Sequence, residues 1–291
     1  MFMEEMQAPL EALLFVRGEP VTAVQLREIL QVDEESLDEL LALAEDAAKK
    51  ANDAIMQNYD KFDIFVKADR SPLTNADLAA NDVIMSTLEP SGIAICSEEC
   101  VLDSKRRMSE ERFWLIDPLD GTKEFIARNG EFCVCIALIE RGRPILAVIS
   151  IPISGDIYSS NGGGVYKNGV LLARPTSAPQ IFMQGHYSRS AKYVQFAQKF
   201  GMQLMCKGSA IKFCILAEGG ASAYARFSDC SLWDIAAGDF LLHQSGGVVV
   251  DLKTMEAPLY NGKSLINNHY LAVGANAMKN LSEMLEFAKN F

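Results

Sequence analysis

No run of apolar residues in this sequence reaches the roughly 18 that a membrane-spanning helix needs. The N-terminus also lacks a basic segment followed by a long apolar stretch, so we predict neither a membrane span nor a secretory signal. The seven cysteines form no CxxC or CxxH pair. Cys133 and Cys135 alternate on a strand-like run and are interpreted as buried thiols, which favours a reducing cytoplasm.

Positive charge is also scarce. The chain has 27 Lys and Arg against 38 Asp and Glu, a net charge of −11. This balance disfavours non-specific binding to nucleic acid, but it does not exclude an anionic small molecule, because bound metal ions can reverse the charge of a site. The 291 residues, 49% of them hydrophobic, provide a core for one large domain or two ordinary ones.

Helical and strand patterns are mixed along the chain, which predicts layers of helices and sheets. The expected elements are a helix over 36–59, a helix capped by Thr74 or Asn75, strands that end at Glu98 and Asp117, a hairpin around Arg141, an amphipathic helix over "LWDIAAGDFLLHQ", and a closing helix over 276–290.

The stretch "WLIDPLDGTKEF" places two aspartates directly after a run of apolar residues. Pro118 has no N–H and fixes its own φ near about −65°, so we predict a stiff turn that directs Asp117 and Asp120 into one space. Residues 121–125 can begin a helical turn whose free N–H groups face the same space. Crowded carboxylates need a cation between them, and Mg²⁺ is the hard cation that oxygen ligands favour. The alternative is an ordinary aspartate-rich turn.

Acidic residues stand at three further ends of elements. Glu98 and Glu99 follow an apolar strand, Asp77 lies just behind the predicted cap Thr74, and Asp234 lies in the first turn of a helix. Asp229 and Ser231 are available as caps of that helix. Each acid alone is explained by solvation or by the helix dipole, but together they favour one shared site.

The order D…EE…DPLDGT…WD resembles the lithium-sensitive phosphatase superfamily, which includes inositol monophosphatase and fructose bisphosphatase. The segments "VKAD.SPLT.AD", "WLIDPLDGTKEFI.RNGEF", "GS..KFC..AEG.A..Y.RF" and "WD.AAG" are similar to those of bacterial 3'(2'),5'-bisphosphate nucleotidases, over roughly residues 36–273. The resemblance implies an α+β fold, a layered αβαβα sandwich over 36–291, with two closely packed α/β halves at about 36–175 and 176–291.

The activity that the resemblance implies is Mg²⁺-dependent hydrolysis of the 3'-phosphate of adenosine 3',5'-bisphosphate by metal-activated water, with two or three Mg²⁺ ions. 3'-Phosphoadenylyl sulfate is a further candidate substrate, and lithium inhibition is expected. The alternatives are an inositol or sugar monophosphatase of the same superfamily, and a non-catalytic interaction protein associated with condensin. The expected partner is a small nucleotide, without nucleic acid or membrane, and the sequence makes no prediction of oligomeric state.

The resemblance also assigns roles to individual residues. The metal ligands are expected to be Glu98, Asp117, the carbonyl of Leu119, Asp120 and Asp234. Asp77 and Thr122 are expected to orient and deprotonate the attacking water, with Asp69 and Glu99 supporting the ligands. The expected substrate contacts are the backbone at Gly121 and Thr122, and the side chains of Ser188, Ser209, Lys212, Tyr224 and Arg226. Family members commonly have histidine in place of Ala191, so Tyr187 or His186 is left to contact the base.

Residues 1–35 fall outside this pattern. The stretch "APLEALLFVRGEPVTAVQLREILQVDEESLDEL" resembles the opening helices of bacterial segregation and condensation protein B, whose N-terminal half is a winged helix. Because the rest of that domain is missing, we expect a helical, partly winged-helix-like extension that covers an apolar patch, rather than a working chromosome-segregation module.

Overall fold

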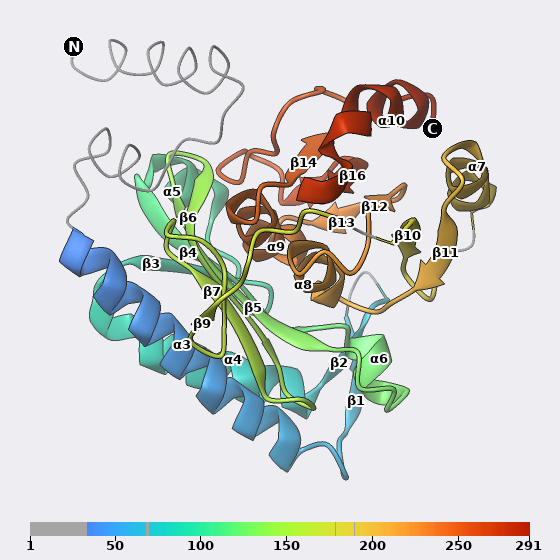
Figure 1. The fold of residues 1–291 in the computed structure, drawn as a ribbon. Coiled ribbons are helices and arrows are strands. Elements are labelled where there is room, and N and C mark those ends of the chain that lie inside the picture. Colours follow the sequence, from blue (N-terminus) through green and yellow to red (C-terminus); the bar gives the residue numbers. More distant parts are fainter. Residues whose placement is uncertain (1–33, 68–69, 178, 189) are drawn as a thin grey trace.

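The computed structural model describes residues 34–67, 70–177, 179–188 and 190–291 (Figure 1). The predicted N-terminal extension lies almost entirely outside the described residues, and so does Asp69. Within the ranges described, the helices are too short or too polar to cross a membrane.

Two sheets form the centre of the molecule (Figure 1). The first sheet has seven strands in the order β3-β4-β5-β6-β7-β8-β9, and the second has five in the order β11-β10-β12-β16-β14. The strands of the first are β3 (Ala94–Ser97), β4 (Arg112–Asp120), β5 (Cys133–Glu140), β6 (Arg143–Ile151), β7 (Asp156–Ser160), β8 (Tyr166–Lys167) and β9 (Val170–Leu171). Those of the second are β10 (Ile181–Gln184), β11 (Gln203–Cys206), β12 (Ala223–Arg226), β14 (Val248–Asp251) and β16 (Tyr270–Val273). Two short pairs complete the strands, β1 (Ile64–Val66) with β2 (Pro72–Thr74) and β13 (Cys230–Ser231) with β15 (Ile266–Asn267).

Helices separate and cover the two sheets. The pair α3 (Glu34–Gln57) and α4 (Asn75–Leu88) packs on the outer face of the first sheet. The pair α8 (Ile211–Ala217) and α9 (Trp233–Gln244) lies between the sheets, and α7 (Ala191–Lys199) and α10 (Leu281–Ala288) cover the second. The short helices are α5 (Ser104–Ser109) and α6 (Thr122–Ile126), with 3-10 turns at Glu89–Ser91 and Ala275–Asn280. The layers therefore follow the predicted order α-β-α-β-α.

Strand β4 is apolar on both faces because each face packs in a different hydrophobic core. Trp114 and Ile116 pack in the core under α3 and α4, whereas Phe113 and Leu115 pack in the core around α8 and α9. Because successive side chains of a strand point to opposite faces, Asp117 points to the α9 side. The strand thus delivers a carboxylate into the space between the two sheets.

The predicted end of the strand at Asp117 is wrong. Strand β4 continues to Asp120, and its pairing with β5 shifts register between Asp117 and Asp120. Pro118 has no N–H to give to the ladder, and the Leu119 N–H instead donates to the Asp117 carboxylate at 3.0 Å. The predicted turn is therefore a bulge inside a strand, and it leaves both aspartates at the end of the sheet.

The helix predicted at 232–244 is confirmed as α9, but its predicted amphipathic character is wrong, because α9 is buried on nearly all sides. It contacts β5 and β6 of the first sheet and β14 of the second, so it has no broad face left for solvent. The other expected elements are confirmed, with the closing helix divided into a 3-10 turn and α10. The two large sheets come from residues 94–171 and 181–273, and the division into halves at about residue 175 stays a prediction.

Candidate active site

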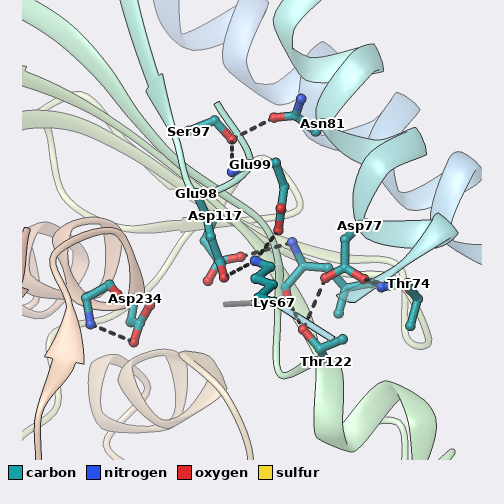
Figure 2. A network of polar contacts seen from close by, with 12 residues as sticks. Lys67, Thr74, Asp77, Asn81, Ser97, Glu98, Glu99, Asp117, Thr122 and Asp234 are labelled. Carbon is teal, nitrogen blue, oxygen red and sulfur yellow. Dashed lines mark hydrogen bonds and ion pairs between the residues drawn. The ribbon is translucent and has the colours of Figure 1, made fainter. Parts of the chain in front are cut away.

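Acidic side chains from separate segments converge where β3 and β4 end, facing the first turn of α9 (Figure 2). Strands β3 and β4 are parallel and pair Ser97 with Ile116, so the next residues, Glu98 and Asp117, are neighbours. The Glu98 N–H donates to the Ile116 carbonyl at 3.1 Å, which fixes this register one residue beyond the strand. Asp234 faces them from α9, and Asp120 follows the bulge.

The pKa values of these acids show that their charges interact. Burial raises the pKa of Asp117 well above its ordinary value, and repulsion from the other three acids, Glu98, Asp120 and Asp234, raises it further. Burial, followed by repulsion from Asp120, raises the pKa of Asp234 to about 8 despite the opposing charge of Arg226. The convergence of oxygen donors that repel one another is the arrangement that a hard divalent cation relieves.

Two thiols border this cluster. The ligand atoms of Asp120, Cys133 and Cys135 lie within 4.8 Å of one another. A hydrogen bond with Cys133 and then burial raise the pKa of Cys135 well above its ordinary value, so this thiol keeps its proton. Both thiols are buried, as predicted, and an uncharged thiol is a poor ligand for a hard cation.

Asp77 and Thr122 form a hydrogen-bonded pair beside the acids (Figure 2). Thr74 caps α4, and its N–H and hydroxyl donate to Oδ2 of Asp77 at 2.8 and 2.6 Å. The Thr122 hydroxyl donates to the other oxygen, Oδ1, at 3.1 Å. The capping box therefore fixes the carboxylate of Asp77 and presents one of its oxygens to Thr122.

Lys67 is a site residue that sequence reasoning missed. Its ammonium lies 2.6 Å from one carboxylate oxygen of Glu98 and 2.6 Å from one of Glu99 (Figure 2). Although burial disfavours the charged form, the two glutamates raise the pKa of Lys67. The signal was the Lys in "VKAD", but a lone Lys next to a short strand is most often a surface charge. Its position shows that the glutamates accept a cation.

The predicted phosphate cradle and Ser209 lie together. Gly121 has φ 98°, and a Cβ built on it would lie 3.2 Å from the Ser209 Cβ and 3.2 Å from the Glu131 carbonyl oxygen. A side chain there would be both strained and crowded. Ser209 itself has φ 49°, an uncommon conformation for a residue other than glycine.

The other predicted substrate residues differ in their surroundings. Lys212 is only 4% exposed, and its ammonium donates to the carbonyls of Lys207 and Ser209, so it supports a loop. Tyr224 is buried and accepts a hydrogen bond from Tyr270 at 3.2 Å. These contacts do not test the predicted roles in substrate binding.

Two further predicted substrate residues, Arg226 and Ser188, donate hydrogen bonds to backbone carbonyls. The Arg226 guanidinium donates to the Asp229 carbonyl at 3.3 Å, and the Ser188 N–H donates to the Gly185 carbonyl at 3.1 Å. The expected caps of α9 are wrong. Leu232 is the N-cap and has no side-chain hydrogen bond there, while the Asp234 carboxylate accepts from the Ser231 N–H at 3.2 Å.

The model of the inositol monophosphatase family matches residues 36–286 of this sequence. The chain belongs to the inositol monophosphatase family. A similar curated protein, the 3'(2'),5'-bisphosphate nucleotidase CysQ of Shigella flexneri, is 43% identical over 215 residues, which are 70% of this chain and 87% of that protein. CysQ of Haemophilus influenzae is 30% identical over 261 residues, 84% of this chain and 95% of its own.

Among solved structures, CysQ from Bacteroides thetaiotaomicron, described as a bacterial member of the inositol monophosphatase family, is similar with a TM-score of 0.72. Its identity is 32%, and the match covers 81% of this chain and 97% of that one. The predicted family and layered α+β fold are therefore confirmed, and so is the prediction that this chain is a phosphatase. The clustered acids Glu98, Asp117, Asp120 and Asp234 all lie within the matched region.

Proposed function

We propose that this phosphatase is a Mg²⁺-dependent 3'(2'),5'-bisphosphate nucleotidase. It removes the 3'-phosphate of adenosine 3',5'-bisphosphate to give AMP and phosphate, and it accepts 3'-phosphoadenylyl sulfate as a related substrate. The observation that carries the proposal is the convergence of Glu98, Asp117, Asp120 and Asp234 beside the Thr122–Asp77 pair. The nucleotidase relatives supply the substrate class.

The four acids and the Leu119 carbonyl are the residues that would hold two or three Mg²⁺ ions. Bound there, the ions supply positive charge to the phosphate and lower the pKa of water. The donor set fits, because it consists of oxygens whose mutual repulsion raises the pKa of Asp117 and Asp234. The Lys67 ammonium, which contacts Glu98 and Glu99, offsets part of the negative charge at the edge of the cluster.

Thr122 and Asp77 provide the proton path. The Thr122 hydroxyl can accept a proton from the attacking water because it gives its own to Oδ1 of Asp77, 3.1 Å away. Thr74 holds the second oxygen of Asp77, so the carboxylate cannot turn away from Thr122. The backbone at Gly121 and Thr122 is the proposed cradle for the scissile phosphate.

Substrate contacts are assigned to the loop at Ser209, which lies against Gly121, and to Arg226, whose guanidinium can bind the second phosphate. Lys212 supports the same loop from beneath. Ser188 and Tyr224 remain assigned to the nucleotide side. We also propose a cytoplasmic location, since all seven cysteines are free thiols.

A panel of phosphate monoesters tests the proposal. With Mg²⁺, kcat/KM for adenosine 3',5'-bisphosphate should exceed that for inositol monophosphate, and EDTA should abolish phosphate release. Asp120→Asn should stay folded and lose the activity. A preference for inositol monophosphate would identify the alternative activity, and a chain that releases phosphate from no monoester would be the non-catalytic interaction protein.

A further inference from the structure

One carboxylate outside the acid cluster joins the two large sheets. Glu131 lies between α6 and β5, and its Oε1 is 3.0 Å from the Lys207 ammonium. Its Oε2 is 2.6 Å from Nε2 of His186 and accepts the Gly208 N–H at 2.6 Å. Although burial opposes it, these hydrogen bonds lower the pKa of Glu131, so the carboxylate stays charged. The three partners of Glu131, which are His186, Lys207 and Gly208, all belong to segments that follow strands of the second sheet.

The three partners come from two neighbouring strand ends. Strands β10 and β11 are parallel and pair Gln184 with Cys206, and the Lys207 N–H donates to the Gln184 carbonyl at 2.9 Å. His186 and Lys207 therefore leave the same edge of the second sheet. The single carboxylate of Glu131 therefore contacts both segments, the one after β10 and the one after β11.

Gly208 shows how closely the segments approach. A Cβ built on Gly208 would lie 2.7 Å from the Glu131 carbonyl oxygen and 2.9 Å from the Glu131 Cβ. It would also lie 2.6 Å from the Cγ of Glu124. Only glycine fits, so the contact between Glu131 and the backbone of residue 208 is direct.

The same contact fixes the loop of residues 207–210. The Ala210 N–H donates to the Asp120 carboxylate, and Ser209 lies over Gly121. Lys212 holds the carbonyls of this loop from its own side of the molecule. Glu131 therefore ties the loop to the first sheet's side independently of Asp120, one of the proposed metal ligands.

We propose that Glu131 is a positioning residue for substrate binding, which holds the 207–210 loop over Gly121 so that Ser209 and the phosphate cradle form one surface. The proposal rests on the phosphatase function proposed above. Without the carboxylate, the Lys207 ammonium loses its partner, the Gly208 N–H loses its acceptor, and the loop moves away from Gly121. Substrate binding weakens, whereas Thr122 and Asp77 keep their hydrogen bond.

Three variants and two controls test this role. Glu131→Ala removes the carboxylate, Glu131→Gln keeps an oxygen acceptor without the charge, and Gly208→Ala forces the loop away while the Glu131 carboxylate is present. Glu111→Gln breaks an exposed ion pair with Arg141, and Gly262→Ala adds a Cβ in open space, so these two are the matched controls.

Steady-state kinetics should show an increase in KM for adenosine 3',5'-bisphosphate of about 10-fold in Glu131→Ala and Gly208→Ala, with kcat within about 3-fold of wild type. Glu131→Gln should give a smaller increase, and the controls should leave KM unchanged. In the substrate-free protein, hydrogen exchange of peptides covering residues 207–210 should be faster in Glu131→Ala, with the rest of the chain unchanged.

A folded Glu131→Ala protein with unchanged KM and unchanged exchange would overturn the proposal. A fall in kcat at constant KM would also overturn it, because Glu131 would then act on the chemical step. If Glu131→Ala fails to fold, Glu131→Gln and Gly208→Ala give the same comparison. If the wild type hydrolyses only inositol monophosphate, the nucleotidase function fails, and KM for that substrate tests Glu131 in the same variants.

Discussion

Replacing Asp234 with asparagine should stabilise the metal-free protein, and the gain should be larger at pH 8 than at pH 5. The reason is the raised pKa of Asp234, which burial and the neighbouring Asp120 shift from 3.8 to about 8. The folded protein then binds a proton that the unfolded chain has released. Stability is full below the unfolded pKa and falls as the pH rises toward the folded pKa. Asparagine has no such proton, and it keeps an oxygen for the Ser231 N–H.

The size of the effect follows from the shift. Each pKa unit corresponds to about 1.4 kcal/mol, so the full change from 3.8 to about 8 is worth about 6 kcal/mol. Because the residue is half-buried and titrates together with its neighbours, we expect about half of this value. Between pH 5 and pH 8, the advantage of Asp234→Asn should therefore grow by about 2 kcal/mol. That corresponds to about 1 M in the urea midpoint for an m value of about 2 kcal/mol/M.

Urea unfolding in EDTA, followed by tryptophan fluorescence, measures this difference. The two tryptophans are buried in different layers, Trp114 on β4 and Trp233 at the start of α9, so both parts of the site are observed. Excess Mg²⁺ at pH 8 should reverse the order of stability, because the cation binds the folded wild type and binds Asp234→Asn more weakly.

Asp103→Asn is the matched control, since Asp103 is an exposed cap whose acceptor role asparagine keeps. The difference in stability between Asp103→Asn and the wild type should be the same at pH 5 and at pH 8. The reasoning is refuted if the gain of Asp234→Asn is equal at both pH values, or if Mg²⁺ stabilises that variant as much as it stabilises the wild type.

Four other substitutions probe the rest of the site. Thr122→Val removes the hydroxyl that donates to Asp77 and should lower kcat by about 10² to 10⁴ with little change in KM. Asp77→Asn should lower kcat by a similar factor. Because the two residues act as a unit, kcat of the double variant should be only slightly lower than that of either single variant. Lys67→Met leaves two glutamates without their cation, so the free energy of unfolding in EDTA should fall by about 1 to 3 kcal/mol and recover partly in Mg²⁺, while equal losses with and without Mg²⁺ would contradict a shared cation site. Gly121→Ala should cost about 1 to 3 kcal/mol in a thermal unfolding assay, because the residue has φ 98° and close neighbours, and an unchanged Tm would show that the backbone there can relax.

The sequence by itself determined the local features of this protein. Periodicity located α3 and the hairpin of β5 and β6, and the cap of α4 was predicted to be Thr74 or Asn75, of which the structure has Thr74. The acids at Glu98 and Asp117 were recognised because each follows an apolar strand, and the resemblance connected them to a phosphatase. These signals are carried by neighbours in the chain, so they can be read without the fold.

Only the tertiary structure decided which distant groups meet. The parallel register of β3 and β4 places Glu98 beside Asp117. The antiparallel pair of β1 and β2 brings Lys67 to the carboxylate of Glu98. Glu131 gains its role because two strand ends of the other sheet arrive next to it, and α9 is buried because both sheets pack on it. Pairing between sheets depends on register and packing across the whole chain, and no window of sequence contains that information.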